Sequence, residues 1–164
     1  MSGADNGFSA TTRLYQIDLD PKSLANNNPN VQHEREVAIF DLLEGNCFAL
    51  EGRDDGPYRL ALSIAEDRLV IDVGHERSDG VVTFMLSLSP FRRILKDYFI
   101  VCDSYYEAIR SLPPSRIQAI DMGRRALHDE GTRVLMERLK GKITVDFDTA
   151  RRLFTLISAL HWKG

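Results

Sequence analysis

The chain has 164 residues, 43% of them hydrophobic, and a net charge of −3, which is enough apolar material to bury the core of one ordinary domain. Its two cysteines, Cys47 and Cys102, exclude a disulfide framework, and no Cys or His spacing predicts a zinc site. No apolar run is long enough for a membrane span or has the form of a signal peptide, so we expect a cytoplasmic protein that makes no membrane contact.

Charge is distributed unevenly along the chain. Residues 1–90 carry 7 Lys and Arg against 15 Asp and Glu, whereas residues 91–164 carry 14 against 9. The two halves can compensate each other within one domain, or the basic half can present a face to an anionic partner. We favour compensation, because the whole chain has a pI of about 5.8 and nucleic-acid modules are usually strongly basic.

The N-terminal part of the chain is predicted to hold a tail, a strand and a helix. Residues 1–12 are small and polar and are expected to be disordered, in front of a single domain over residues 13–164. Apolar residues alternate over 14–19, which predicts a short strand. After an Asn-rich loop that can supply a cap, residues 31–44 are predicted to be helical.

Three stretches of alternating apolar and polar residues then predict a sheet. They cover residues 58–64, 68–73 and 81–88, and Glu66 and Asp67 are expected to form a tight turn between the first two. Parallel neighbours would need long crossovers, so strands joined by such short turns are expected to pair antiparallel. This part of the sequence predicts a β-meander.

Helical periodicity dominates from Ser89 onward. A long helix with a broad apolar side is predicted from Ser89 to about Ser111. The next helix is predicted to start at a capping box, residues 115–118, and to pause at Gly131 before it resumes.

A short strand over residues 142–147 and a last helix capped by Asp148 complete the predicted elements. Their order indicates an α+β fold. We expect an antiparallel β-meander plus an N-terminal strand, packed on one face by about four helices.

Five long blocks stand out in the sequence: HEREVAIFDLLEGN, GPYRLALSI, LSLSPFRRILKDYFIVCDSYYEAIR, AIDMGRRALHDEG and DFDTARRLFTLISALHW. In these blocks the protein resembles a family of small uncharacterised proteins from alphaproteobacteria, and the similarity covers nearly the whole chain after about residue 13. The resemblance implies a bacterial cytosolic setting. Because that family carries no assigned activity, the resemblance implies no catalytic or binding residues.

Arg124 interrupts the apolar side of its predicted helix. It lies between Ile117 and Ile120, while Asp121 and His128 flank it at i−3 and i+4. A guanidinium does not lose its proton, and an isolated buried ion is strongly unfavourable. Arg124 therefore needs an anion nearby, for which Asp121 is the local candidate, or must extend to solvent.

Glu36 is a second charge on an apolar helix side, which it shares with Phe40, and His33 lies one turn before it. We predict that Glu36 and Arg124 meet across a helix interface, with His33 or His128 at its edge. The alternative is that each side chain runs its stem along apolar surface and ends in water.

If this cluster opens to solvent, Arg124, Arg125 and His128 can hold a carboxylate or phosphate. A catalytic version, with His128 as a base oriented by Asp121, needs a nucleophile or a substrate pocket that the sequence does not show. No HExxH spacing occurs, so no metal or cofactor is predicted. Neighbours on a helix point apart, so solvation is expected for most of the tandem arginines, Arg92 and Arg93, Arg124 and Arg125, and Arg151 and Arg152.

Trp162 and Ile100 are apolar residues on otherwise charged helix faces and predict an oligomer or partner interface. Our first interpretation is a cytosolic binding protein, a homodimer or an adaptor, in preference to an enzyme. The second is an enzyme or sensor for a small anionic ligand around Arg124 and His128, and the third is nucleic-acid binding through the basic half. A concave pocket lined by Arg124 and His128 would favour the second interpretation, and a flat contact through Trp162 or Ile100 the first.

Overall fold

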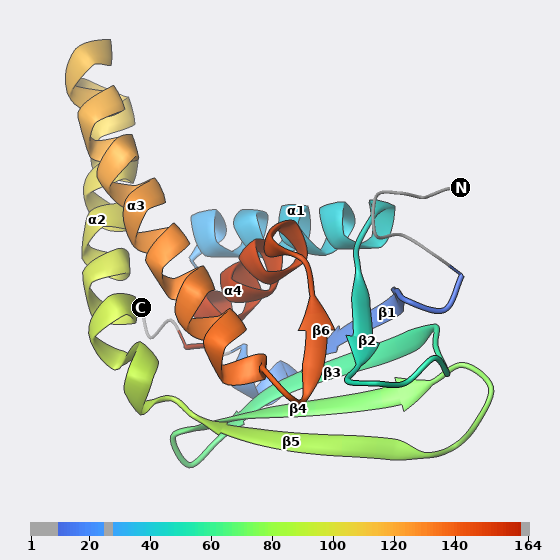
Figure 1. The fold of residues 1–164 in the computed structure, drawn as a ribbon. Helices are drawn as coiled ribbons and strands as arrows, with labels where there is room; N and C mark the ends of the chain where they lie inside the picture. The colour runs from blue at the N-terminus through green and yellow to red at the C-terminus, as the bar shows by residue number, and fades with distance from the viewer. Residues whose placement is uncertain (1–9, 25–27, 162–164) are drawn as a thin grey trace.

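The computed structural model describes residues 10–24 and 28–161 and has two layers, a four-stranded sheet and a layer of helices on one of its faces (Figure 1). The predicted α+β fold class is therefore confirmed. The strands of this sheet are β1 (Leu14–Leu19), β3 (Tyr58–Ala65), β4 (Arg68–His75) and β5 (Val81–Ser87). They lie in the order β1-β3-β4-β5, with β1 parallel to β3 and the other two pairs antiparallel. The meander with an N-terminal strand beside it is as predicted.

A second, two-stranded sheet joins two segments that lie far apart along the chain. Strand β2 (Phe48–Leu50) pairs antiparallel with β6 (Ile143–Val145). The sequence predicted β6 within a longer stretch and did not predict β2, because three consecutive buried residues show no alternation. This pairing places the helix after β6 next to the N-terminal half of the chain.

The helical layer is built from four α-helices. Two short 3₁₀ turns, Pro21–Ser23 and Ser89–Phe91, precede the first and the second of them. Asn28 caps the first helix by accepting hydrogen bonds from the N–H groups of Asn30 and Val31. The α-helices are α1 (Pro29–Glu44), α2 (Arg92–Ser111), α3 (Pro114–Leu139) and α4 (Phe147–His161).

Three details of the predicted helices were wrong. Helix α3 starts at Pro114 after Pro113, with no side-chain cap, so the capping box is not used. It continues through Gly131 without a pause. The glycine serves close packing against α4, because a Cβ there would lie closer than 3.0 Å to three atoms of the Phe154 ring. Asp146 rather than Asp148 caps α4, accepting a hydrogen bond of 2.9 Å from the Thr149 N–H.

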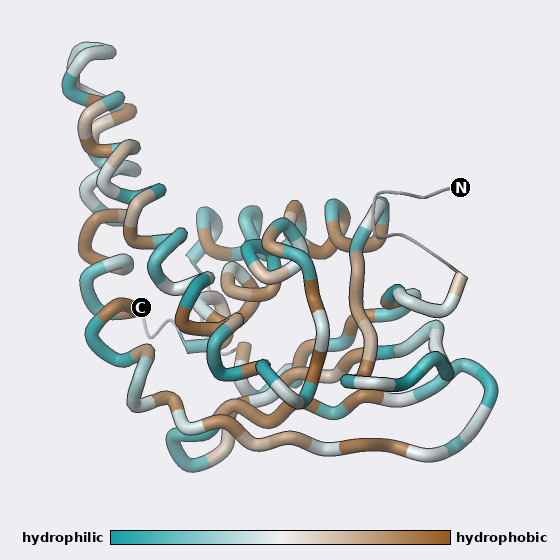
Figure 2. Tube along the Cα trace, viewed as in Figure 1, coloured by the Kyte–Doolittle hydropathy of each residue, from teal (hydrophilic) through white to brown (hydrophobic). Residues whose placement is uncertain are grey.

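The core lies between the sheet and the helices (Figure 2). Helix α4 is buried along most of its length, whereas α1 presents a different side to the core from the predicted one. Val31, Ala38 and Leu42 of α1 are buried, and Phe40, predicted to face inward, is 63% exposed. Apolar residues lie on several sides of α1, so more than one orientation satisfied the pattern. The small side chain of Ala38 fits the inward side between closely packed helices.

Helices α2 and α3 form an antiparallel hairpin whose end extends beyond α1 and α4 (Figure 1). Ile109 of α2 is exposed, because its part of the helix lies in this extension. Ile100 is 58% and Met122 66% exposed. Trp162, the other predicted interface residue, lies outside the described residues, as does most of the predicted tail. Within residues 10–24 and 28–161, no helix combines the length and the apolar character that a membrane crossing requires.

Candidate functional site

A cleft of about 550 Å³ lies between α1, α3 and α4, with Tyr98 of α2 in its wall. This volume is typical of pockets for small organic molecules. Arginine pairs from two helices line it. The charged and titratable side chains in its wall are Arg124, Arg125 and His128 of α3, Arg151 and Arg152 of α4, and His33, Glu34 and Asp41 of α1.

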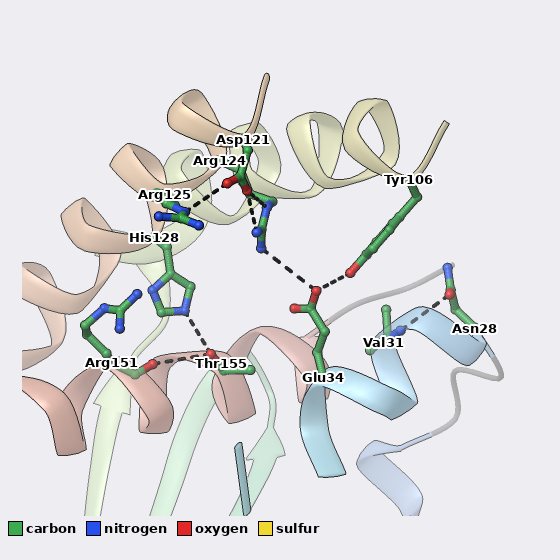
Figure 3. Close-up of polar contacts among 10 residues, drawn as sticks. All are labelled: Asn28, Val31, Glu34, Tyr106, Asp121, Arg124, Arg125, His128, Arg151 and Thr155. Carbon is green, nitrogen blue, oxygen red and sulfur yellow. Dashed lines mark hydrogen bonds and ion pairs between the residues drawn. The ribbon is translucent and has the colours of Figure 1, made fainter. Parts of the chain in front are cut away.

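Arg124 is held by acids on two helices (Figure 3). Its Nη2 and Nε donate to Asp121 Oδ1 at 2.6 and 3.0 Å, and its Nη1 lies 3.9 Å from Glu34 Oε2. The guanidinium also stacks over the Tyr105 ring, 4.5 Å from its centre. Burial acts to lower the pKa of Arg124, but the hydrogen bond to Asp121 and the nearby negative charges raise it above its ordinary value. The predicted local partner, Asp121, therefore does hold Arg124.

The predicted partner on the neighbouring helix was wrong by two positions. Glu36 is exposed and does not line the cleft, whereas Glu34 turns toward Arg124. The difference follows from the orientation of α1, whose inward side runs through Val31, Ala38 and Leu42. His33 lines the cleft from an exposed position, so both predicted histidines lie at its wall.

Glu34 has a second partner behind the cleft. The Tyr106 hydroxyl on α2 donates a short hydrogen bond to Glu34 Oε2 (Figure 3). Burial and this bond raise the pKa of Tyr106, so the phenol keeps its proton and remains a donor. The Cys102 thiol lies nearby, and burial raises its pKa to about 12, so it is an unreactive thiol at neutral pH.

His128 is 8% exposed, and its Nε2 lies 2.8 Å from Thr155 Oγ1 on α4. The Thr155 hydroxyl donates to the Arg151 carbonyl oxygen, so its oxygen accepts from Nε2–H. Within the described residues, the buried Nδ1 atom has no hydrogen-bond partner. Burial and the Arg151 charge lower the pKa of His128 to about 4. His128 is therefore neutral at pH 7, and Nδ1 is a hydrogen-bond acceptor.

This geometry does not include the orientation of His128 by Asp121 that a catalytic version of the cluster requires. Asp121 bonds to Arg124 and Arg125, and Thr155 instead orients His128. Among the described residues, no three His, Cys, Asp or Glu side chains are grouped so that they could hold a metal ion.

The other three arginines of the cleft contact their acids through Nε. Arg125 Nε lies 2.9 Å from Asp121, Arg151 Nε 3.3 Å from Asp129, and Arg152 Nε 3.8 Å from Asp41. Within the part of the chain that the structure describes, the terminal Nη groups of these three arginines make no hydrogen bond. Donors of this kind can bind the oxygens of a carboxylate or phosphate in pairs.

The sequence did not predict the α4 side of this cleft. Arg151 and Arg152 were expected to be solvated, and Thr155 and Glu34 were not singled out. No local pattern could identify them, because α4 reaches α3 only through tertiary packing, as in the approach of Phe154 to Gly131.

Comparisons with known proteins place the chain in a family. Residues 11–163 match the model of the family described as "Uncharacterised protein family (UPF0262)". A UPF0262 protein of Rhodopseudomonas palustris (strain BisB5) is 56% identical over 155 residues, which are 94% of this chain and 95% of that protein. One from Bradyrhizobium sp. (strain BTAi1) is 57% identical over 159 residues, 96% and 95% of the two chains. One from Nitrobacter winogradskyi is 57% identical over 152 residues, 93% and 91%.

No solved structure matches the chain. These relatives confirm the predicted resemblance to a family from alphaproteobacteria. The match to the family model includes the three helices that form the cleft, α1, α3 and α4. The chain belongs to the UPF0262 family.

Proposed function

We propose that this protein binds a small organic anion, bearing phosphate or carboxylate groups, in the cleft between α1, α3 and α4, and that it does so in the cytoplasm. The observation that carries the proposal is the convergence of two arginine pairs, Arg124 and Arg125 of α3 and Arg151 and Arg152 of α4, on one concave site. In three of these side chains Nε makes the ion-pair contact, and among the described residues their terminal Nη groups donate no hydrogen bond. Such donors match the geometry of carboxylate and phosphate oxygens.

The apolar part of the wall supports an organic ligand over an inorganic ion. Val37 and Ala38 of α1 and the Tyr98 ring line the same cleft. A single phosphate group would fill only part of a space of about 550 Å³. The uncharged part of the ligand would pack on this apolar wall while its charged groups bind the arginines.

Binding is better supported than catalysis. A base with a pKa of about 4 is weak at neutral pH, and efficient general bases have pKa values near the working pH. His128 therefore lines the cleft as a neutral side chain held by Thr155, and it adds no positive charge to that of the arginines.

Protein association is a second candidate function. Ile100 and Met122 are exposed on the α2–α3 hairpin, and exposed apolar residues of this size are frequent in interfaces. Sedimentation analysis of the wild type and of Ile100→Glu tests it: a dimer that the substitution dissociates supports association. A monomeric wild type with no partner would count against it.

A thermal-shift titration tests the main proposal. We expect diphosphate, as a simple probe, to raise the melting temperature of the wild type saturably, by about 5–10 °C at a hundredfold excess over Kd. Arg125→Gln should reduce the shift. Arg133→Gln is the matched control, because Arg133 is exposed on the same helix and outside the cleft. Equal shifts in both variants, or none in the wild type with any phosphate or carboxylate probe, would count against the proposal.

A further inference from the structure

The acids of α1 contact the arginines of the cleft more loosely than the other acids do. Arg124 Nη1 lies 3.9 Å from Glu34, and Arg152 Nε lies 3.8 Å from Asp41. Both distances exceed those of hydrogen bonds. The pairs that do not involve α1 are shorter, from 2.6 Å for Arg124 with Asp121 to 3.3 Å for Arg151 with Asp129. The weak pairs are thus confined to the contacts of α1 with α3 and with α4.

These two acids stand where an anionic ligand would have to bind. Glu34 and Asp41 line the same cleft as the arginines, so a bound anion would meet their negative charges as well as the guanidinium groups. An anion can therefore bind tightly only if it replaces the two carboxylates as partner of Arg124 and Arg152.

Both carboxylates can lose their arginine without leaving an uncompensated buried charge. Glu34 keeps the hydrogen bond from the Tyr106 hydroxyl, and its side chain is 31% exposed. Asp41 has a side chain that is 42% exposed and can be hydrated where it stands. The exchange therefore avoids the large penalty that follows when one partner of a buried ion pair is removed.

The charges also indicate the class of ligand. Asp121 and Asp129 neutralise part of the arginine cluster from outside the cleft. Once Glu34 and Asp41 are displaced, Arg124 and Arg125 share Asp121 and Arg151 keeps Asp129, so the four arginines carry two uncompensated positive charges. One of these charges belongs to Arg124 and Arg125 of α3 together and the other to Arg152 of α4, so one anionic group at each helix restores the balance.

We infer that Glu34 and Asp41 act as internal competing anions, and that the ligand carries at least two anionic groups, which replace them on Arg124 and Arg152. The inference rests on the proposed function and adds the ligand class and a mechanism that weakens the binding of singly charged anions. The affinity of the cleft is then set by α1 as well as by the arginines.

Calorimetric titration of diphosphate and orthophosphate at fixed ionic strength tests this inference. We expect Glu34→Gln and Asp41→Asn each to tighten diphosphate binding about fivefold, because each removes about 1 kcal/mol of competing charge interaction. Glu36→Gln is the matched control: it removes the same charge from the same helix at an exposed position outside the cleft, and its affinity should change less than about twofold. Diphosphate should bind more tightly than orthophosphate.

The outcomes separate the inference from the proposed function. If the wild type binds diphosphate but Glu34→Gln and Asp41→Asn behave like Glu36→Gln or bind more weakly, the competing role is wrong and the binding function stands. Equal affinities for orthophosphate and diphosphate would overturn the requirement for two anionic groups. If no variant binds either probe, the proposed function falls as well. Asp41→Asn keeps the test valid should Glu34→Gln unfold, since Asp41 is more exposed than Glu34.

Discussion

Replacing Arg124 with methionine tests whether the ionic cluster of α3 stabilises the fold. The substitution keeps an unbranched side chain but removes the hydrogen bonds to Asp121 and the contact with the Tyr105 ring. Hydrogen bonds to a charged group contribute about 1.5–3 kcal/mol, and a cation over an aromatic ring adds about 0.5–1 kcal/mol. Asp121 keeps its ion pair with Arg125, and methionine gains apolar contacts, which offset part of the loss.

The net expected loss is about 1–3 kcal/mol of the free energy of unfolding. The 20% exposure of the Arg124 side chain places the value below that of a fully buried pair. Urea denaturation of Arg124→Met against wild type measures it, and Arg133→Met, at an exposed site of the same helix, should change stability by less than about 0.5 kcal/mol. If Arg124→Met unfolds at the same urea concentration as Arg133→Met, the ionic cluster does not stabilise the fold.

Three further predictions concern stability and reactivity. The pKa of His128 falls from an ordinary 6.5 to about 4 in the folded protein, so the unfolded chain binds the proton first as the pH is lowered. The contribution of the neutral His128 to the free energy of unfolding should therefore be complete above pH 6.5 and fall by up to about 3 kcal/mol as the pH drops toward 4. A pH series of urea denaturations should show a smaller fall for His128→Gln. Gly131→Ala should destabilise the protein by about 1–3 kcal/mol, because a methyl group there overlaps the buried Phe154 ring, and a melting temperature equal to or above that of wild type would contradict this close packing. The Cys102 thiol is buried and has a pKa of about 12. In the Cys47→Ser variant, where Cys102 is the remaining cysteine, it should react with a disulfide reagent at pH 8 far more slowly in the folded protein than in the protein unfolded in urea. Equal rates in the two states would mean that the thiol is accessible in the folded protein.

The parts of the fold that the sequence predicted are those fixed by local rules. The meander follows from the alternation of apolar residues and from short turns, and Glu66 and Asp67 indeed form one with positive φ angles of 51° and 69°. The contact of Asp121 with Arg124 was likewise predictable, because residues three apart on a helix are neighbours.

The parts that the sequence could not predict depend on packing between distant segments. Strand β2 is defined by a partner, β6, that lies far along the chain. The orientation of α1, which decides between Glu34 and Glu36, is set by its contacts with α4 and the sheet rather than by its own pattern. The arginines of α4 enter the site for the same reason, since the close approach of α4 to α3 depends on the absence of a side chain at Gly131.

The most direct test of anion binding in the cleft is a nuclear magnetic resonance titration that follows the Nε–H groups of the arginines as diphosphate is added. We expect saturable shifts for the four arginines of the cleft, Arg124, Arg125, Arg151 and Arg152. Arg133 and Arg138, which are exposed on α3 outside the cleft, should not shift. Shifts of equal size on these two exposed arginines, or no shift at the four arginines of the cleft, would contradict anion binding in the cleft.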